Sequence, residues 1–230
     1  MIRQMFEHES CTFTYLLFDK KSKDCILLDP VKETVSRDLK VIGDLGLNLK
    51  YIIDTHVHAD HITGAGEIRE ITGAKTVVGE NTNVACADIH IKDNEKIAFG
   101  GCKLRAIATP GHTSGCMSYH IGNAVFTGDS LLIGGNGRTD FQGGSAEKLY
   151  HSITERLFTL PKTTTVYPGH NYIGLQISTI AEEMQHNPRI GQEKSKNDFI
   201  NLMKNLKLPK PKQIIKSIPA NLECGSIDED

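Results

Sequence analysis

Residues 54–66 read DTHVHADHITGAG, and the eight positions from Asp54 to His61 hold three histidines and two aspartates. The stretch follows an apolar run at 51–54, which predicts a short strand. A helix is predicted over 61–73, with apolar residues at helical spacing, Asp60 as its N-cap and Gly73 at its end. Imidazoles and carboxylates crowded onto a loop between a strand and a helix predict a metal site.

The spacing of these side chains limits the kind of site. If the backbone stays extended after the strand, His56, His58 and Asp60 point to the same side, whereas His61 faces elsewhere until the chain turns. This differs from the HExxH pattern, in which two histidines share one face of a helix. The alternative is a set of hydrogen-bonded core histidines with Asp60 acting only as a cap. The number of histidines in so short a loop disfavours it.

Three distant segments offer matching side chains, each at the end of a predicted strand. His112 lies in the tight loop TPGHTSG, Asp129 ends AVFTGD and His170 ends TTTVYPGH. The same local design at every position indicates a common metal centre. The ligand inventory by itself suggests two ions. His56, His58 and His112 would hold one ion, and Asp60, His61 and His170 the other, with Asp129 as the bridge.

The composition gives no sign of a nucleic-acid or membrane partner. The chain has 230 residues, a formal net charge of −2 and no uninterrupted apolar stretch of ~18 residues, so we expect neither nucleic acid nor a membrane as partner. Glu7 and Glu9 precede the first apolar run, unlike the layout of a secretory signal. Six scattered cysteines without a CxxC pattern predict reduced thiols and a cytoplasmic location.

Short apolar runs bounded by turn residues predict strands along most of the chain, at 11–18, 24–29, 51–54, 75–80, 103–110, 117–122, 124–129 and 163–170. Helical periodicity predicts helices at 32–46, 61–73, 145–160, 174–186 and 190–206. Strands followed by helices, twice over, predict an α+β fold in which two sheets pack face to face with helices outside. We expect a single domain over residues 1–230, with a C-terminal extension from about residue 207 that wraps over the surface.

The series THVHADH, GHTSG, FTGD and YPGH resembles the motif series of the metallo-β-lactamase superfamily. The resemblance spans most of the chain and implies the fold of that superfamily, a four-layer αβ/βα sandwich. All the ligand positions are filled, as in the glyoxalase II branch, whose dinuclear zinc enzymes hydrolyse glutathione thioesters. A binding or regulatory protein on a degenerate version of the fold is disfavoured, because no ligand position is missing.

Longer stretches resemble persulfide dioxygenases, also called sulfur dioxygenases. These stretches are THVHADHITGAGEI, TGDSLLIGGNGRTDFQGGSAEKLYHSI, YPGHNYIG and LPKPKQIIKSIPANLECG. The resemblance runs nearly from end to end. It implies that glutathione persulfide, O₂ and water are converted to glutathione and sulfite by a homodimeric enzyme. Some relatives continue into a rhodanese domain, which this chain is too short to contain.

The same resemblance implies one Fe(II) per chain, bound by the residues that match His56, His112 and Asp129. Two imidazoles and a carboxylate form the facial triad of non-haem iron oxygenases, and iron supplies a redox step that zinc cannot. Other residues are implied to orient these ligands or to relay protons: His58, Asp60, His61 and His170. A further group is implied to contact the substrate: Arg138, Tyr172 and Thr113. Relatives often carry a cysteine in the glycine-rich loop, where this chain has Asn136.

Overall fold

A computed structural model describes residues 1–226 of the chain. The chain forms two compact units. The first, the N-terminal unit, contains Met1–Ile91, Lys96–Lys103 and, of the described residues, 210–226. The second, the central unit, contains Lys92–Glu95 and Leu104–Pro209.

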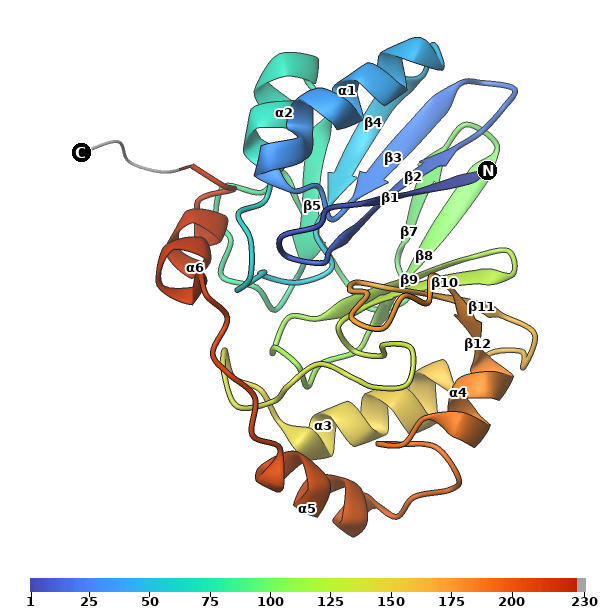
Figure 1. The fold of residues 1–230 in the computed structure, drawn as a ribbon. Helices are drawn as coiled ribbons and strands as arrows, with labels where there is room; N and C mark the ends of the chain where they lie inside the picture. The colour runs from blue at the N-terminus through green and yellow to red at the C-terminus, as the bar shows by residue number, and fades with distance from the viewer. Residues whose placement is uncertain (227–230) are drawn as a thin grey trace. The chain divides into compact units, whose positions relative to one another are not determined.

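The N-terminal unit is built on a six-stranded mixed sheet in sequence order, β1-β2-β3-β4-β5-β6 (Figure 1). The first three strands pair antiparallel, and β3 to β6 pair in parallel. The parallel part brings the carboxyl ends of β3, β4 and β5 to the same edge of the sheet. The strands are β1 (Ile2–Phe6), β2 (Phe13–Phe18), β3 (Asp24–Leu28), β4 (Asn48–Ile53), β5 (Lys75–Gly79) and β6 (Ile89–Ile91).

Two helices cover one face of this sheet, α1 (Val35–Asp44) after a 3₁₀ turn at Lys32–Thr34, and α2 (Ala65–Thr72). Their apolar faces pack on side chains of β2, β3 and β4, and this core buries Val35, Ile42 and Ile68. The helix predicted over 61–73 is shorter in the structure, where α2 spans Ala65–Thr72. It begins after Gly64, which offers no side-chain cap, so the prediction that Asp60 caps this helix is wrong.

The second sheet has the order β12-β11-β10-β9-β8-β7. β8, β9 and β10 pair antiparallel, β10 and β11 pair in parallel, and β12 is an antiparallel edge. The parallel pair places the ends of β10 and β11 beside each other, which positions the two metal-capable side chains that follow them. The strands are β7 (Lys96–Phe99), β8 (Cys102–Ala108), β9 (Met117–Ile121), β10 (Ala124–Gly128), β11 (Thr165–Pro168) and β12 (Ser178–Thr179).

In the central unit, three helices lie on one face of the sheet (Figure 1): α3 (Ala146–His151), α4 (Ile180–His186) and α5 (Lys196–Asn205). A core of buried apolar side chains from these helices and from β8, β10 and β11 joins them. The predicted cap is confirmed, since Ser145 Oγ accepts a hydrogen bond from the Lys148 amide. After α3 the helix continues in a π-helical stretch, Ser152–Leu157. The helix expected over 174–186 starts only at Ile180, because residues 174–177 lie in a loop and Ser178–Thr179 form β12.

The C-terminal extension contains a helix that the sequence reading missed, α6 (Ile214–Leu222), with Pro219 inside it. Two residues beyond it, Cys224 forms a disulfide with Cys86, 138 residues away in the sequence. The prediction of six reduced cysteines is wrong for this pair, while Cys11, Cys25, Cys102 and Cys116 are free. Spacing could not reveal the pair, because only the folded path of α6 brings the two together. No helix among residues 1–226 has the length and apolar character needed to cross a membrane.

Candidate metal centre

The histidine loop, residues 54–64, leaves the carboxyl end of β4 and leads into α2. It bends rather than continuing as a strand, so His61 joins the other two histidines. The rings of His56 and His58 lie 4.1 Å apart between centroids, and those of His58 and His61 lie 4.2 Å apart. All three side chains are buried. Buried imidazoles need defined partners, and these partners decide which nitrogen of each ring is left for a metal.

Asp29, the residue after β3, organises the start of the histidine loop. Its carboxylate accepts hydrogen bonds from the Thr55 amide (2.7 Å), the Thr55 hydroxyl (3.1 Å) and His58 Nε2 (3.1 Å). The Thr55 hydroxyl has one proton, and it donates that proton to Asp29. Its oxygen must therefore accept the bond that joins it to His56 Nδ1 at 2.9 Å. The proton of neutral His56 then lies on Nδ1, which leaves the Nε2 lone pair for a metal.

Several carboxylates surround the buried ring of His58. Burial by itself lowers the pKa of His58, but the neighbouring carboxylates, Asp29 first among them, raise it to about 9. The pKa of Asp54 is raised to about 7 by burial, against the opposing effect of His58. The Asp54 carboxylate also accepts a bond from the Thr63 hydroxyl at 3.0 Å. These charge and hydrogen-bond interactions therefore link the histidine loop to the end of β3 and to the residues that precede α2.

The Asp60 carboxylate forms hydrogen bonds with the neighbouring His61 and with Thr12, and does not cap α2. Its Oδ2 is 2.8 Å from His61 Nδ1 and 3.3 Å from the Thr12 hydroxyl, which reaches across from the segment before β2. Thr12 also lies 3.3 Å from His61 Nδ1. The carboxylate thus fixes the ring of His61.

Asn221, near the end of α6, binds the backbone of the histidine loop. Its amide nitrogen donates to the carbonyls of His58 (2.8 Å) and His61 (2.9 Å), and its carbonyl accepts from the Thr63 amide (2.8 Å). Asn221 is 4 % exposed. Sequence reasoning missed both Asn221 and Asp29, because neither lies in a metal-binding motif. The only signal for Asp29 was its place after a buried strand, directly before Pro30.

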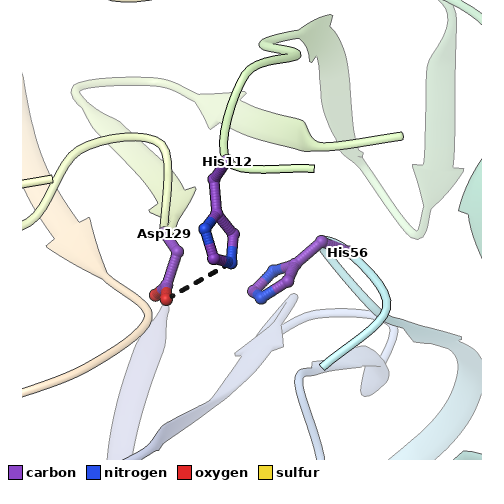
Figure 2. Close-up of side chains that lie close together, drawn as sticks. All are labelled: His56, His112 and Asp129. Atoms are coloured by element: carbon purple, nitrogen blue, oxygen red, sulfur yellow. Dashed lines mark ion pairs between the residues drawn. The ribbon is translucent and has the colours of Figure 1, made fainter. Parts of the chain in front are cut away.

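In the central unit, His112 and Asp129 face each other. His112 Nδ1 donates to the Arg138 carbonyl at 2.7 Å, so the other nitrogen, Nε2, carries the lone pair. That nitrogen is 3.7 Å from Asp129 Oδ2. Figure 2 shows this pair with a dashed line, and draws His56 with them. Gly111 shapes the loop, because its φ is 143° and a Cβ there would lie 2.4 Å from the backbone of Leu149.

Asp129 is held on both sides. Its Oδ1 accepts a bond from His170 Nδ1 at 2.6 Å, and its carbonyl accepts one from the Gly137 amide at 2.7 Å. A Cβ on Gly137 would lie 2.6 Å from that carbonyl and 2.7 Å from His112 Nδ1. The glycine-rich loop thus packs directly against both side chains, and only glycine fits at 137.

Within the N-terminal unit, two groups of side chains bring ligand atoms within 4.8 Å of one another. The first consists of His58, Asp60 and His61, and the second of Asp29, Asp54 and His58. His58 belongs to both. Its Nδ1 is buried without a hydrogen-bond partner among the described residues. Each unit therefore has clustered metal-capable groups at its strand ends, as the sequence indicated.

The residues expected to contact a substrate have other partners as well. Arg138 forms a bidentate ion pair with Asp140, at 2.7 Å for both bonds, and also donates to the carbonyls of Leu208 and Pro209. The side chain of Tyr172 is 65 % exposed, and its ring is stacked on His170 at 5.4 Å between centroids.

Thr113 and Asn136 lie deeper in the central unit. Thr113 is buried, with its hydroxyl 3.2 Å from the Cys116 sulfur. Asn136 is buried too, and its amide nitrogen donates to the Gly137 carbonyl and to the Met203 sulfur. Asn136 thus ties the glycine-rich loop to α5.

The comparisons with known proteins agree with the motifs and the two sheets. The family model described as the metallo-beta-lactamase superfamily matches residues 12–100 and 87–170. The chain belongs to this superfamily. The predicted fold class is confirmed as the metallo-β-lactamase fold, with two mixed sheets and helices.

Two relatives share the designation ETHE1. The chain is 49% identical over 228 residues to the human protein "Persulfide dioxygenase ETHE1, mitochondrial", a match that covers 98% of this chain and 89% of the human one. It is also 49% identical to ETHE1 from Myxococcus xanthus, whose crystal structure matches with a TM-score of 0.96 over 98% of this chain and 100% of that one. A more distant relative, a probable metallo-hydrolase of Burkholderia pseudomallei, is 31% identical over 99% of this chain and 94% of its own.

Proposed function

We infer that this chain is a persulfide dioxygenase, an enzyme that oxidises glutathione persulfide with O₂ and water to glutathione and sulfite. The observation that carries this inference is the 49% identity over 98% of the chain to a protein named for that activity. The ligand-type residues lie at the strand ends where the sequence placed them, and all of them are present.

We propose that one Fe(II) is bound per chain by His56, His112 and Asp129. Together they offer two imidazole nitrogens and one carboxylate oxygen. The hydrogen bonds described above suit this assignment, because the Nδ1 atom of each histidine is engaged and the Nε2 atom carries the lone pair. When bound, Fe(II) on such a triad supplies open coordination positions and the redox step. Zinc lacks that redox chemistry.

The remaining residues have hydrogen-bond partners that suit supporting roles around a single ion. His58 Nε2 donates to Asp29, and Asp129 Oδ1 accepts from His170. Asp60 is bonded to His61. These bonds orient the side chains but leave His58 Nδ1 buried without a hydrogen-bond partner among the described residues, so the assignment of a single ion rests on the chemistry of the facial triad. We therefore propose that His58, Asp60, His61 and His170 orient the ligands and hold protons near them.

For substrate recognition we propose Arg138, Tyr172 and Thr113. The exposed Tyr172 ring offers a face to a glutathione moiety. Arg138 uses four of its five N–H donors on Asp140, Leu208 and Pro209. One donor remains for a substrate carboxylate, so we expect Arg138→Ala to raise KM with little change in kcat.

A test of this function counts the metals and follows O₂. The protein is purified anaerobically, iron and zinc are measured per chain, and O₂ uptake is recorded on adding glutathione persulfide. We expect one iron and O₂ uptake for the wild type, and loss of both for Asp129→Ala. The matched control is Glu155→Ala, which removes an exposed carboxylate paired with His151. An Asp129→Ala protein that keeps a full iron would contradict the ligand assignment.

A dinuclear zinc thioesterase of the glyoxalase II type is the second candidate. The cluster of His58, Asp60 and His61 favours it, since three ligand atoms of one loop lie within 4.8 Å of one another. Two zinc ions per chain, cleavage of a glutathione thioester and no O₂ uptake would establish this alternative and overturn the dioxygenase.

We further propose that the protein acts in the cytoplasm as a single-domain homodimer without nucleic acid as partner. The net charge of −2 supports the last point. Light scattering coupled to gel filtration measures the oligomeric state, and fractionation of the producing cells measures the location. A monomer, or a chain found outside the cytoplasmic fraction, would refute the corresponding part.

A further inference from the structure

The C-terminal residues 221–225, here called the clasp, grip the histidine loop through its backbone. Asn221 alone satisfies three main-chain groups of that loop, the carbonyls of His58 and His61 and the amide of Thr63. Buried main-chain groups require partners, so without this side chain the loop would have to rearrange or admit water. The clasp is thus a part of the scaffold that holds the loop.

The backbone of the clasp approaches the loop as closely as its side chains do. The Cys224 carbonyl oxygen accepts a hydrogen bond from the Gly66 amide at 2.9 Å, and a Cβ on Gly66 would lie 2.5 Å from that oxygen. The Gly225 carbonyl oxygen accepts a hydrogen bond from the Lys32 ammonium group at 3.1 Å. There is no room for a side chain between the clasp and the start of α2. A shift of the clasp therefore reaches the loop directly.

One covalent bond secures the clasp, the disulfide between Cys224 and Cys86. Cys86 lies in the segment between β5 and β6, where Arg69 of α2 donates to its carbonyl at 2.7 Å. Val57, the residue between the first two histidines, belongs to the same apolar cluster as Cys224. Cys224 is 4 % exposed and Cys86 is half-buried, so reagents reach the disulfide from the side of Cys86.

We propose that the Cys86–Cys224 pair is a thiol switch that controls how firmly the clasp positions the His56 loop. With the disulfide closed, the loop is held ready for metal. With the two thiols reduced, the clasp keeps its hydrogen bonds but loses its anchor, and the loop opens more often. Asn221 is the positioning residue through which the state of the disulfide reaches the loop.

The chemistry of the proposed substrate can operate this switch, and this step rests on the proposed function. The Cys86 thiolate attacks the outer sulfur of a persulfide RS–SH, which breaks the S–S bond and releases RSH. The Cys224 thiolate then attacks the Cys86 sulfur and displaces hydrogen sulfide. In sum, two thiols and one RS–SH give the disulfide, one RSH and one H₂S. The thiols are oxidised and the outer sulfur is reduced. Two molecules of a low-molecular-weight thiol reverse the closure: they reduce the disulfide to two thiols and are themselves oxidised to RS–SR.

The first experiment compares the closed and reduced forms of the full chain without any mutation. Protein is oxidised or treated with dithiothreitol, and the reagents are removed anaerobically. Hydrogen exchange of the amides in residues 56–66 and the rate of iron release to a chelator are then measured. We expect both to be at least threefold faster in the reduced form. The amides of β10 and β11 serve as an internal control and should not change.

Variants separate the effect of the disulfide from that of the Asn221 hydrogen bonds. Cys86→Ser should show the loop exchange and iron release of the reduced wild type, with or without dithiothreitol. Cys102→Ser, which removes a free and partly exposed cysteine, should respond to dithiothreitol as the wild type does. Asn221→Ala should speed loop exchange and iron release even with the disulfide closed. Asn221→Asp keeps the acceptor for Thr63 but turns a carboxylate oxygen toward the carbonyls of His58 and His61, and should speed loop exchange at least as much as Asn221→Ala.

Thiol counting tests the persulfide step. Reduced protein contains six thiols, and closure leaves four. Incubation with glutathione persulfide should lower the count from six to four. A count that stays at six, although diamide closes the pair, would overturn the persulfide step. Equal exchange of residues 56–66 in closed and reduced protein would overturn the switch. Loop exchange is also measured on metal-free protein, so a chain that failed to bind iron would refute the proposed function while still testing the switch.

Discussion

Gly137 is the position where a single methyl group most directly tests the geometry of the candidate centre. A Cβ there would lie 2.6 Å from the Asp129 carbonyl oxygen and 2.7 Å from His112 Nδ1. Ordinary contacts between such atoms are about 3.5 Å or longer, so Gly137→Ala creates an overlap of roughly 0.8 Å. Because the Asp129 carbonyl is backbone, the His112 ring is the group that must move.

The size of the effect follows from these contacts. Overpacking of this kind costs about 1–3 kcal/mol. Moving the ring also weakens the bond from His112 Nδ1 to the Arg138 carbonyl, worth about 1 kcal/mol. If about 2 kcal/mol of this cost falls on metal binding, iron affinity drops roughly 30-fold. If it falls on folding instead, a chain of this length loses about 2–4 °C of Tm per kcal/mol.

The assay measures iron per chain after anaerobic dialysis against a weak chelator, together with thermal unfolding. We expect Gly137→Ala to keep less than half of the iron bound by the wild type and to unfold at a lower temperature. Gly135→Ala is the matched control in the same loop, because the nearest atom to its Cβ is on Arg189 at 3.7 Å, an ordinary contact. A Gly137→Ala protein with full iron and an unchanged Tm would contradict the close packing of this loop against His112 and Asp129, the proposed ligands.

Three further predictions concern the central unit. Burial raises the pKa of Asp93, but the hydrogen bond from a main-chain amide and the Arg156 guanidinium outweigh it and hold that pKa below its usual value. The Asp93–Arg156 pair therefore stabilises the folded protein at pH values above the ordinary aspartate pKa, and this stabilisation is lost as the pH falls through the lowered pKa of Asp93. Asp93→Asn should lower the free energy of unfolding by about 1 kcal/mol at pH 7 and by almost nothing near pH 2, as measured by urea unfolding. Burial raises the pKa of the Cys116 thiol to about 12, so iodoacetamide at pH 8 should label Cys102 and leave Cys116 intact in the folded protein, as peptide mass spectrometry would report. Ser145→Ala removes the cap of α3 and should lower the free energy of unfolding by about 1 kcal/mol; a loss below about 0.3 kcal/mol would show that the helix does not depend on this cap.

The sequence predicted the metal-capable side chains because they lie in loops that directly follow predicted strands. His112, Asp129 and His170 come directly after apolar runs, and parallel pairing of β10 with β11 brings the last two together. Such placement depends only on local patterns and on the geometry of parallel strands. Of the two predicted helix caps, Ser145 is confirmed, because its hydroxyl accepts a hydrogen bond from the first turn of α3. Asp60 does not cap α2, because its carboxylate is bonded to the neighbouring His61.

The sequence could not predict the partners that decide which nitrogen of each histidine is presented. The proton on His56 Nδ1 depends on Thr55 and Asp29, and that on His112 Nδ1 depends on the carbonyl of Arg138. A main-chain carbonyl has no sequence signature, and an aspartate after a strand has many possible roles. These contacts arise only when separate segments fold against one another, so they had to be read from the structure.

The C-terminal extension shows the same limit most clearly. Its sequence is rich in proline and lysine and predicts a surface arm, yet Asn221 and Cys224 reach back to the histidine loop and to Cys86. An asparagine binds two carbonyls and one amide at once only where three main-chain groups already converge. The loop and the clasp are therefore complementary features of one fold, and a change at the far C-terminus is expected to be felt at His56. Removal of residues 221–230 should release iron from the centre faster than Asn221→Ala does, because truncation removes both the side-chain grip and the disulfide anchor.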